Sequence, residues 1–208
     1  MTASEPKPSM IGFISVLEHN SDFYGGLLVL NTAGRPVEFH CTAPVKPTRS
    51  HQVLYGQTLA SYVLADHIGP AMIGNVKSQP QLFCTDCIEL TEIDAKIAEM
   101  VFVPPTQIGE VENAARGLDE DKRFRFEAGH ALGTGPQFLK MLAMQVGNQV
   151  VGINQALQDS QQAISQRLLP FLEQIELSEP FERIHNAIRE SHGIHKTETI
   201  PGQSEVRA

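Results

Sequence analysis

The order of the apolar runs between residues 11 and 104 constrains the fold of this chain more than any other feature of its sequence. Three short apolar runs come first, separated by turn residues, at residues 11–18, 27–31 and 37–42. Further elements follow in the order helix, strand, helix, strand, at residues 50–76, 81–85, 90–100 and 101–103. This order predicts an α/β fold in which an antiparallel three-stranded meander precedes the helix, strand, helix, strand series.

The segment from residue 136 onward has a helical pattern and predicts a C-terminal helical segment. Glutamines occupy one side of it, and apolar residues form a seam on the other, at Ile153, Leu157, Ile164, Leu168, Phe171 and Ile175. This seam, in a helix at 150–175, packs either on the protein's own sheet or on a partner, a second copy of the chain included. A last helix is predicted at 179–191, with Ser178 at its N-cap and Gly193 beyond its end.

The same patterns divide the chain into four parts. Polar composition predicts a disordered lead at 1–9 and a disordered tail at 194–208. Between them we expect an α/β domain at 10–135 and C-terminal helices at 136–193 that pack on this domain.

Composition limits the partners and the location of the protein. The formal net charge is −8 and the pI is about 5.4, whereas capture of a phosphate backbone or an anionic membrane needs clustered Lys and Arg. We therefore expect no nucleic acid partner, and no membrane association. The N-terminus lacks the basic and apolar regions of a secretory signal, and an odd count of three cysteines does not form a disulfide framework. Reduced thiols and a soluble, cytoplasmic protein are the expectation.

Three strands followed by helix, strand, helix and strand is the element order of ribonuclease H-like folds, which residues 11–104 resemble. In that family, metal ions held by carboxylates at strand ends activate water on a phosphodiester. The resemblance implies carboxylates at the ends of the first and fourth strands, where Glu18 and Asp86 stand. Glu89 or Asp94 would supply a third ligand, since Glu38 lies in the middle of a strand. The other interpretation of Glu18 and Asp86, as turn carboxylates beside strand ends, is favoured because Asp and Glu are common there and the acidic chain lacks an obvious phosphate-binding stripe.

A Cys-x-x-Cys sequence offers a second kind of site. Together with a neighbouring His-Cys pair it provides four nitrogen or sulfur ligands, the number that a structural zinc needs: His40, Cys41, Cys84 and Cys87. Successive side chains of a strand point to opposite faces, so each pair contributes one ligand easily and the other with difficulty. Buried reduced cysteines are the alternative interpretation.

No sequence motif identifies a reaction. The chain contains neither a Gly-x-Ser-x-Gly nucleophile elbow nor a His-Glu-x-x-His metal helix. The acidic charge and the helical seam favour a non-catalytic protein-interaction module for which the sequence requires no cofactor. The alternatives are a divalent-metal-dependent nuclease or phosphotransfer enzyme of ribonuclease H-like architecture, and a zinc-stabilised module.

Overall fold

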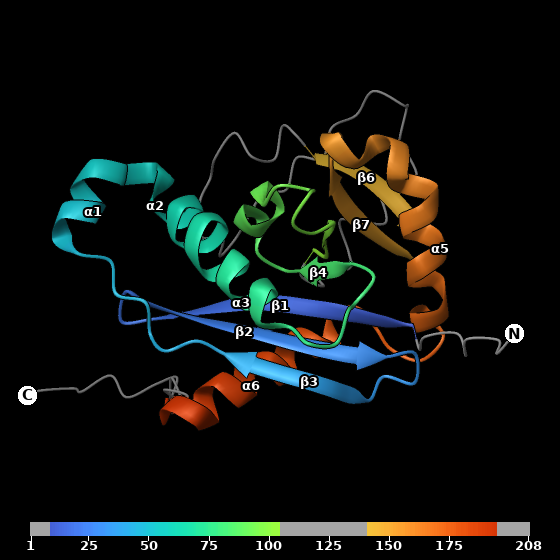
Figure 1. The fold of residues 1–208 in the computed structure, drawn as a ribbon, viewed down its shortest axis with the longest axis horizontal. Helices are drawn as coiled ribbons and strands as arrows, with labels where there is room; N and C mark the ends of the chain where they lie inside the picture. The colour runs from blue at the N-terminus through green and yellow to red at the C-terminus, as the bar shows by residue number, and fades with distance from the viewer. Residues whose placement is uncertain (1–8, 105–140, 195–208) are drawn as a thin grey trace, which may run out of the picture.

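The structure, a computed structural model, describes residues 9–104 and 141–194, and its centre is a seven-stranded sheet of order β3-β2-β1-β4-β5-β7-β6 (Figure 1). The strands are β1 (Met10–His19), β2 (Asp22–Asn31), β3 (Pro36–Cys41), β4 (Phe83–Thr85), β5 (Met100–Phe102), β6 (Met141–Val146) and β7 (Gln149–Asn154). β1 pairs antiparallel with β2 and parallel with β4, β4 runs parallel to β5, and β7 is antiparallel to both of its neighbours. The mixed α/β class and the three-stranded meander are thus confirmed.

β1 and β2 form a long hairpin at the heart of the sheet. The turn between them is made by Asn20 and Ser21, both with positive φ, at 52° and 63°. Such a two-residue turn matches the right-handed twist of the two strands. The apolar runs of both strands are buried on both faces, because helices cover each side of the sheet.

One face is covered by the helical run that follows β3, and the other by the C-terminal helices (Figure 1). The run that follows β3 comprises α1 (Arg49–Tyr55), the 3₁₀ turn η1 (Gly56–Thr58), α2 (Leu59–Ser61), the π-helical η2 (Tyr62–Ile68) and α3 (Gly69–Asn75). Only η2 and α3 bury residues against the sheet, because α1, η1 and α2 have none that are buried. The C-terminal helices comprise the 3₁₀ helix η5 (Gln155–Ser160), α5 (Gln161–Leu172) and α6 (Glu179–His192). Neighbouring residues of β1 contact different layers: Phe13 packs with α6 residues, and Ile14 packs with η2 residues.

Because proline lacks an N–H, the Gly69–Pro70 pair predicts a break or kink within the helix at 50–76, but the helical run continues through it. Helix α3 starts at Gly69 and continues directly from the π-helical turn η2, so the proline occupies the first turn of α3, where its missing N–H costs little. A Cβ on Gly69 would lie 2.4 Å from Ile93 Cδ1. The glycine therefore allows the helix to approach the segment after β4 closely.

Two predicted helices are wrong. The start of the predicted C-terminal helical segment is the β6–β7 hairpin, whose turn includes Gly147 at a φ of 59°. Residues 90–100 contain the end of the 3₁₀ helix η3 (Ile88–Glu92) and turns, one of which is closed by the Asp94 side chain accepting from the Lys96 N–H at 2.9 Å. Such side-chain bonds compete with helix formation. The strand and loop predicted between residues 107 and 131 lie outside the described residues, as does the domain boundary at 135.

The apolar seam of the predicted helix at 150–175 faces inward. Residues 150–154 belong to β7, and α5 buries Ile164, Leu168 and Phe171 in the core cluster that also contains strand and α6 residues. Of the two predicted arrangements, packing of the seam on the protein's own sheet is therefore confirmed, and association with a partner through this seam is wrong. α6 and its left-handed C-cap at Gly193 agree with the prediction. Within the described ranges, no helix has the length and apolar character to cross a membrane.

Candidate functional site

The carboxyl ends of β1 and β4 meet at one edge of the sheet and bring two polar residues together. Ile14 pairs with Thr85, so Ser15 lies beside Asp86, the first residue after β4. Every second side chain of a strand points to the same face of the sheet, so Ser15 shares a face with Phe13, and Asp86 shares it with Cys84. Phe13 and Cys84 lie in the core cluster that contains α6 residues, so this is the face that α6 covers. In open α/β sheets, the crevice outside the carboxyl ends of parallel strands is the usual position of a ligand site.

Helix α6 supplies the third residue, His185. The helix is held on the sheet by Phe181, whose ring meets Phe13 edge-on at a centroid distance of 5.7 Å. A Cβ on Gly26 in β2 would lie 2.3 Å from Ile184 Cγ2, so the helix backbone approaches the strand closely because that position is glycine. This packing fixes the turn of α6 that carries His185 over the end of β1.

Ser15, Asp86 and His185, here called the strand-end cluster, are joined by polar contacts. Ser15 Oγ lies 2.7 Å from His185 Nε2 and also hydrogen-bonds the Asp86 carboxylate. His185 Nε2 lies 4.0 Å from Asp86 Oδ2. Ser15 is 0% exposed, whereas the side chains of His185 and Asp86 are 26% and 21% exposed. A ligand at this edge would therefore meet the imidazole and the carboxylate, and the serine would stay beneath them.

Burial moves the pKa values of the two titratable members toward each other. It raises the pKa of Asp86, against the opposing effects of the Ser15 hydrogen bond and the nearby His185. It lowers the pKa of His185, against the opposing effect of the Asp86 charge, and the neighbouring Arg189 lowers that pKa further. Both changes favour the uncharged forms, so the pKa values of the carboxyl group and the imidazole lie closer together than in an isolated Asp and His.

The hydrogen-bond network assigns the tautomer of the neutral imidazole. If Ser15 donates its hydroxyl proton to Asp86, its oxygen accepts the proton of His185 Nε2, and Nδ1 is then the unprotonated ring nitrogen. The Cys87 thiol donates to Asp86 Oδ1 over 3.4 Å. Asp86 is thus held from two sides in a fixed orientation.

A second buried carboxylate lies one turn further along the chain. Glu89, in η3, is 2% exposed, and its Oε1 has no hydrogen-bond partner among the described residues. Burial raises its pKa to about 7. Its charge acts on the Cys87 thiol, whose own pKa burial raises well above the usual value. Glu89 therefore adds to the titratable groups behind the cluster without reaching its surface.

The structure does not bring Glu18 to Asp86. The Glu18 side chain is exposed. It points to the same face of the sheet as Ile14 and Val16, which pack in the cluster of η2 residues on the face opposite α6. Asp94 closes its turn at the end of η3. Of the carboxylates that the resemblance selects, only Asp86 is a member of the strand-end cluster.

The four residues considered for zinc are also separated. His40 Nε2 donates to the Glu38 carboxylate at 2.6 Å, on the strand at the sheet edge, while Cys41 is exposed. Cys84 is fully buried in the core under α6, and Cys87 contacts Asp86. Among the residues that the structure describes, no group of three or more His, Cys, Asp or Glu side chains is placed to hold a metal ion.

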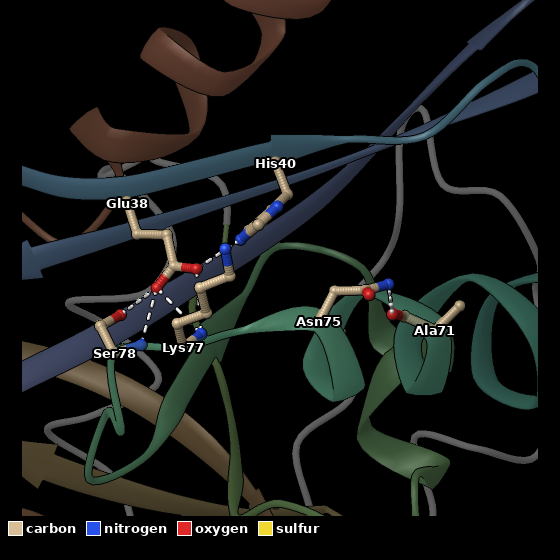
Figure 2. A network of polar contacts seen from close by, with 6 residues as sticks. All are labelled: Glu38, His40, Ala71, Asn75, Lys77 and Ser78. Atoms are coloured by element: carbon tan, nitrogen blue, oxygen red, sulfur yellow. Dashed lines mark hydrogen bonds and ion pairs between the residues drawn. The ribbon is translucent and has the colours of Figure 1, made fainter.

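Glu38 itself forms a clamp that ties β3 to the segment leading into β4 (Figure 2). Its carboxylate accepts the Lys77 N–H at 2.9 Å, the Ser78 N–H at 2.8 Å and the Ser78 hydroxyl at 2.5 Å. These bonds, the Ser78 hydroxyl first among them, lower the pKa of Glu38 to about 2. The protein's own N–H and O–H groups bond the carboxylate, so we assign the clamp a structural role, which is to hold the two segments together.

The strand-end cluster does not fit the two-metal site that the ribonuclease H resemblance implies. Divalent ions that act on phosphodiesters are held by several carboxylate oxygens. The cluster offers one carboxylate, one imidazole and one hydroxyl, with Ser15 at the position on β1 that faces Asp86. Its own chemistry is therefore proton transfer between a carboxyl group and an imidazole.

Neither a protein-family model nor a curated protein matches this chain, but its fold resembles solved structures. Human endonuclease V aligns with 12% identity over 88% of this chain and 84% of its own, at a TM-score of 0.50. A protein of unknown function from Archaeoglobus fulgidus DSM 4304 aligns with 10% identity over 88% and 98%, at 0.47. Ciona intestinalis endonuclease V, in complex with a 23mer DNA containing an inosine, aligns with 13% identity over 89% and 86%, at 0.47.

The fold shared with human endonuclease V contradicts two predictions from the sequence. One is the non-catalytic protein-interaction module, and the other is the absence of a nucleic acid partner. The net charge of −8 led to the second prediction, but it is a property of the whole chain and does not describe the charge at one site.

Two members of the cluster were missed by reasoning from the sequence. Ser15 is the one hydroxyl residue in the apolar run 11–17, a signal that a polar partner lies nearby. His185 stands four residues after Phe181, on the stripe of α6 that faces the sheet. Each signal is local, whereas the partnership joins positions 170 residues apart.

Proposed function

We propose that this protein is a nuclease that cleaves phosphodiester bonds of nucleic acid at the strand-end cluster. The observation that carries the proposal is the pair of partly exposed proton-transfer groups, Asp86 and His185, at the carboxyl ends of two neighbouring parallel strands. The fold shared with human endonuclease V supports the same reaction class. Fold alone does not determine function, so the pair bears most of the argument.

The pair has the chemistry that phosphodiester cleavage needs. One group takes a proton from the attacking hydroxyl, and the other gives a proton to the oxygen that leaves. Asp86 Oδ2 and His185 Nε2 are 4.0 Å apart and both side chains are partly exposed, so a phosphate bound at this edge would meet both side chains. General acid–base catalysis of this kind contributes about 10²- to 10⁴-fold in rate.

Arg189 is the residue that we propose to contact the phosphate. It lies one helical turn after His185 on α6, and its positive charge reaches the imidazole. A guanidinium presents a planar fork of donors that suits a phosphate group. One such contact beside the cluster is compatible with the acidic balance of the chain as a whole.

The experiment is a cleavage assay with labelled single- and double-stranded DNA and RNA, each with Mg²⁺, with Mn²⁺ and with excess EDTA. We expect the wild type to cleave at least one substrate, and Asp86→Asn and His185→Gln to lose about 100-fold in rate. Glu18→Gln is the matched control, because Glu18 is an exposed carboxylate on the other face of β1. The control also identifies a contaminating nuclease, which would be unaffected by all three changes.

Two outcomes would overturn the proposal. One is a protein that folds and cleaves none of the substrates. The other is cleavage that Asp86→Asn and His185→Gln leave at the level of Glu18→Gln.

The cytoplasmic location predicted from the sequence is also kept as a proposal. Cys41, Cys84 and Cys87 are free thiols, which supports a reducing compartment. Fractionation of the source cells, with the protein detected by antibody, checks this location.

A further inference from the structure

We infer that the substrate of the strand-end cluster is RNA, and that the nucleophile is the ribose 2′-hydroxyl next to the bond that breaks. The inference rests on the proposed nuclease function and names its substrate class and its mode of cleavage. The products would be a 2′,3′-cyclic phosphate on one fragment and a 5′-hydroxyl on the other.

The first step of the argument is the composition of the cluster. Ser15 occupies the place on β1 from which a second carboxylate would face Asp86, and Glu18 lies on the other side of the sheet. Among the described residues, the cluster thus has the single carboxylate of Asp86, whereas nucleases bind the ions that activate water with several carboxylate oxygens. Water attacks an anionic phosphodiester poorly without such activation.

The second step is the source of a better nucleophile. A hydroxyl that is part of the substrate reacts with effective molarities of about 10⁵–10⁸ M when it is well oriented. RNA carries such a hydroxyl next to every internal phosphate, and DNA does not. A site with an acid and a base, but with few ligands for a metal, therefore suits RNA.

The third step is the placement of the acid and the base. In the neutral tautomer set by Ser15, Nδ1 of His185 is unprotonated and accepts a proton. The Asp86 carboxyl group lies 4.0 Å from the other ring nitrogen of His185, and both side chains are partly exposed. A phosphate bound at this edge would therefore meet an imidazole that can act as the base and a carboxyl group that can act as the acid.

The reaction balances within these groups. The 2′-oxygen forms a bond to phosphorus, and its proton moves to Nδ1 of His185. The bond from phosphorus to the 5′-oxygen breaks, and the proton of the Asp86 carboxyl group moves to that oxygen. No electrons are exchanged with another reactant, and the two side chains return to their starting forms by proton exchange with water.

Ser15 is a positioning residue in this scheme. It is fully buried, so it does not reach the substrate. Its hydroxyl bonds both Asp86 and His185 and sets which ring nitrogen carries the proton. An imidazole with the wrong tautomer would present a donor where the reaction needs an acceptor.

The pH dependence follows from the two groups and their surroundings. Asp86 is contacted by Ser15 and Cys87. The charges of Glu182 and Arg189, both on α6, change the pKa of His185. The charge of Glu89 raises the pKa of Cys87. His185 must be neutral and Asp86 protonated, so activity falls below the pKa of the imidazole and above the pKa of the carboxyl group. Because burial lowers the pKa of His185, we expect the optimum below about pH 6.5, the ordinary value for His.

The test compares three oligonucleotides of one sequence, made of RNA, of DNA and of RNA with 2′-O-methyl groups, each in Mg²⁺ and in excess EDTA. We expect cleavage of the RNA alone, at the same rate with and without EDTA, and mass spectrometry to find cyclic phosphate and 5′-hydroxyl ends. Ser15→Ala should lower the rate about tenfold and shift the pH optimum, and Ser15→Thr should restore it, since the hydroxyl returns. Thermal unfolding of both variants checks that they fold.

The outcomes separate this inference from the proposed function. Cleavage of DNA or of 2′-O-methyl RNA, 5′-phosphate ends, or loss of activity in EDTA would overturn the inference and leave a nuclease at Asp86 and His185. Failure to cleave any substrate would overturn both. A Ser15→Ala enzyme with an unchanged pH profile would remove the role given to Ser15.

Discussion

Glu38 and Asp86 are two carboxylates of one sheet that their surroundings have made chemically opposite. Glu38, on the edge strand, accepts two backbone N–H groups and a hydroxyl, and its pKa falls to about 2 (Figure 2). Asp86, at the end of a central strand, has a pKa that burial raises although Ser15 and Cys87 donate to it. The balance between hydrogen-bond donors and lost solvation decides the result in each case.

The comparison distinguishes a structural carboxylate from a chemical one. A carboxylate whose oxygens are satisfied by the protein stays ionised and neither takes nor gives a proton near neutral pH. One that is poorly solvated but reachable from the surface has a raised pKa and is more readily protonated. Sequence position alone would not separate them, since each residue belongs to or follows a short strand.

The largest expected effect is on catalysis. Asp86→Asn should reduce the rate of RNA cleavage about 100-fold, since the amide keeps the shape of the carboxyl group but has no proton to give. Glu38→Gln should change that rate less than about twofold, as expected of a surface structural residue. Rates measured side by side on one RNA check this prediction. Equal losses in the two variants would show that the comparison is wrong.

The next effect is on stability and involves Glu89, which is more deeply buried than Asp86 and whose Oε1 has no hydrogen-bond partner among the described residues. The folded state raises the pKa of Glu89 from 4.5 to about 7. The stability that the buried, protonated Glu89 allows is therefore fully present below about pH 4.5. Ionisation of Glu89 lowers the free energy of unfolding as the pH rises through 7. Glu89→Gln, which imitates the protonated form, should stabilise the protein at pH 8 by on the order of 2 kcal/mol.

Urea unfolding at two pH values measures this difference. At pH 4 the variant and the wild type should have the same free energy of unfolding. A variant that is less stable than the wild type at pH 8 would mean that the ionised carboxylate has a partner there.

The smallest effect is the loss of the Glu38 clamp. Glu38→Gln should lower the free energy of unfolding by about 1 kcal/mol at pH 7, because hydrogen bonds to a charged acceptor are replaced by weaker ones. The folded-state pKa is lowered from 4.5 to about 2. The stabilisation is thus present above pH 4.5 and disappears as the pH falls through 2.

Acid titration of both proteins, followed by circular dichroism, checks this prediction. The two unfolding curves should converge as the solution becomes more acidic. A gap that persists below pH 2 would assign the effect of the substitution to packing instead of charge.

The sequence predicted the parts of the fold that local patterns encode. The meander of β1 to β3 and the final helix α6 follow from alternation, turn residues and the glycine at 193. The β6–β7 hairpin was missed because the apolar spacing that begins at Ile153 continues into α5 and gave the whole stretch a helical period. Gly147, whose φ is positive, was the local sign of a turn.

The candidate site was predicted in part. Asp86 was selected because a resemblance in element order points to the end of the fourth strand. Its two partners could not be selected in this way, because Ser15 is an isolated polar residue in an apolar run and His185 one of several scattered histidines. Only the packing of α6 on β1 and β2 shows that they meet.

The distance along the chain between Ser15 and His185, 170 residues, has a consequence for biosynthesis. Translation begins at the N-terminus, and the early parts of a chain fold first. The β1–β2 hairpin is made long before α6, so a nascent chain holds the serine and the aspartate but not the imidazole. A protein that cuts RNA would in this way remain harmless to its own messenger and to the ribosome until its synthesis is almost complete.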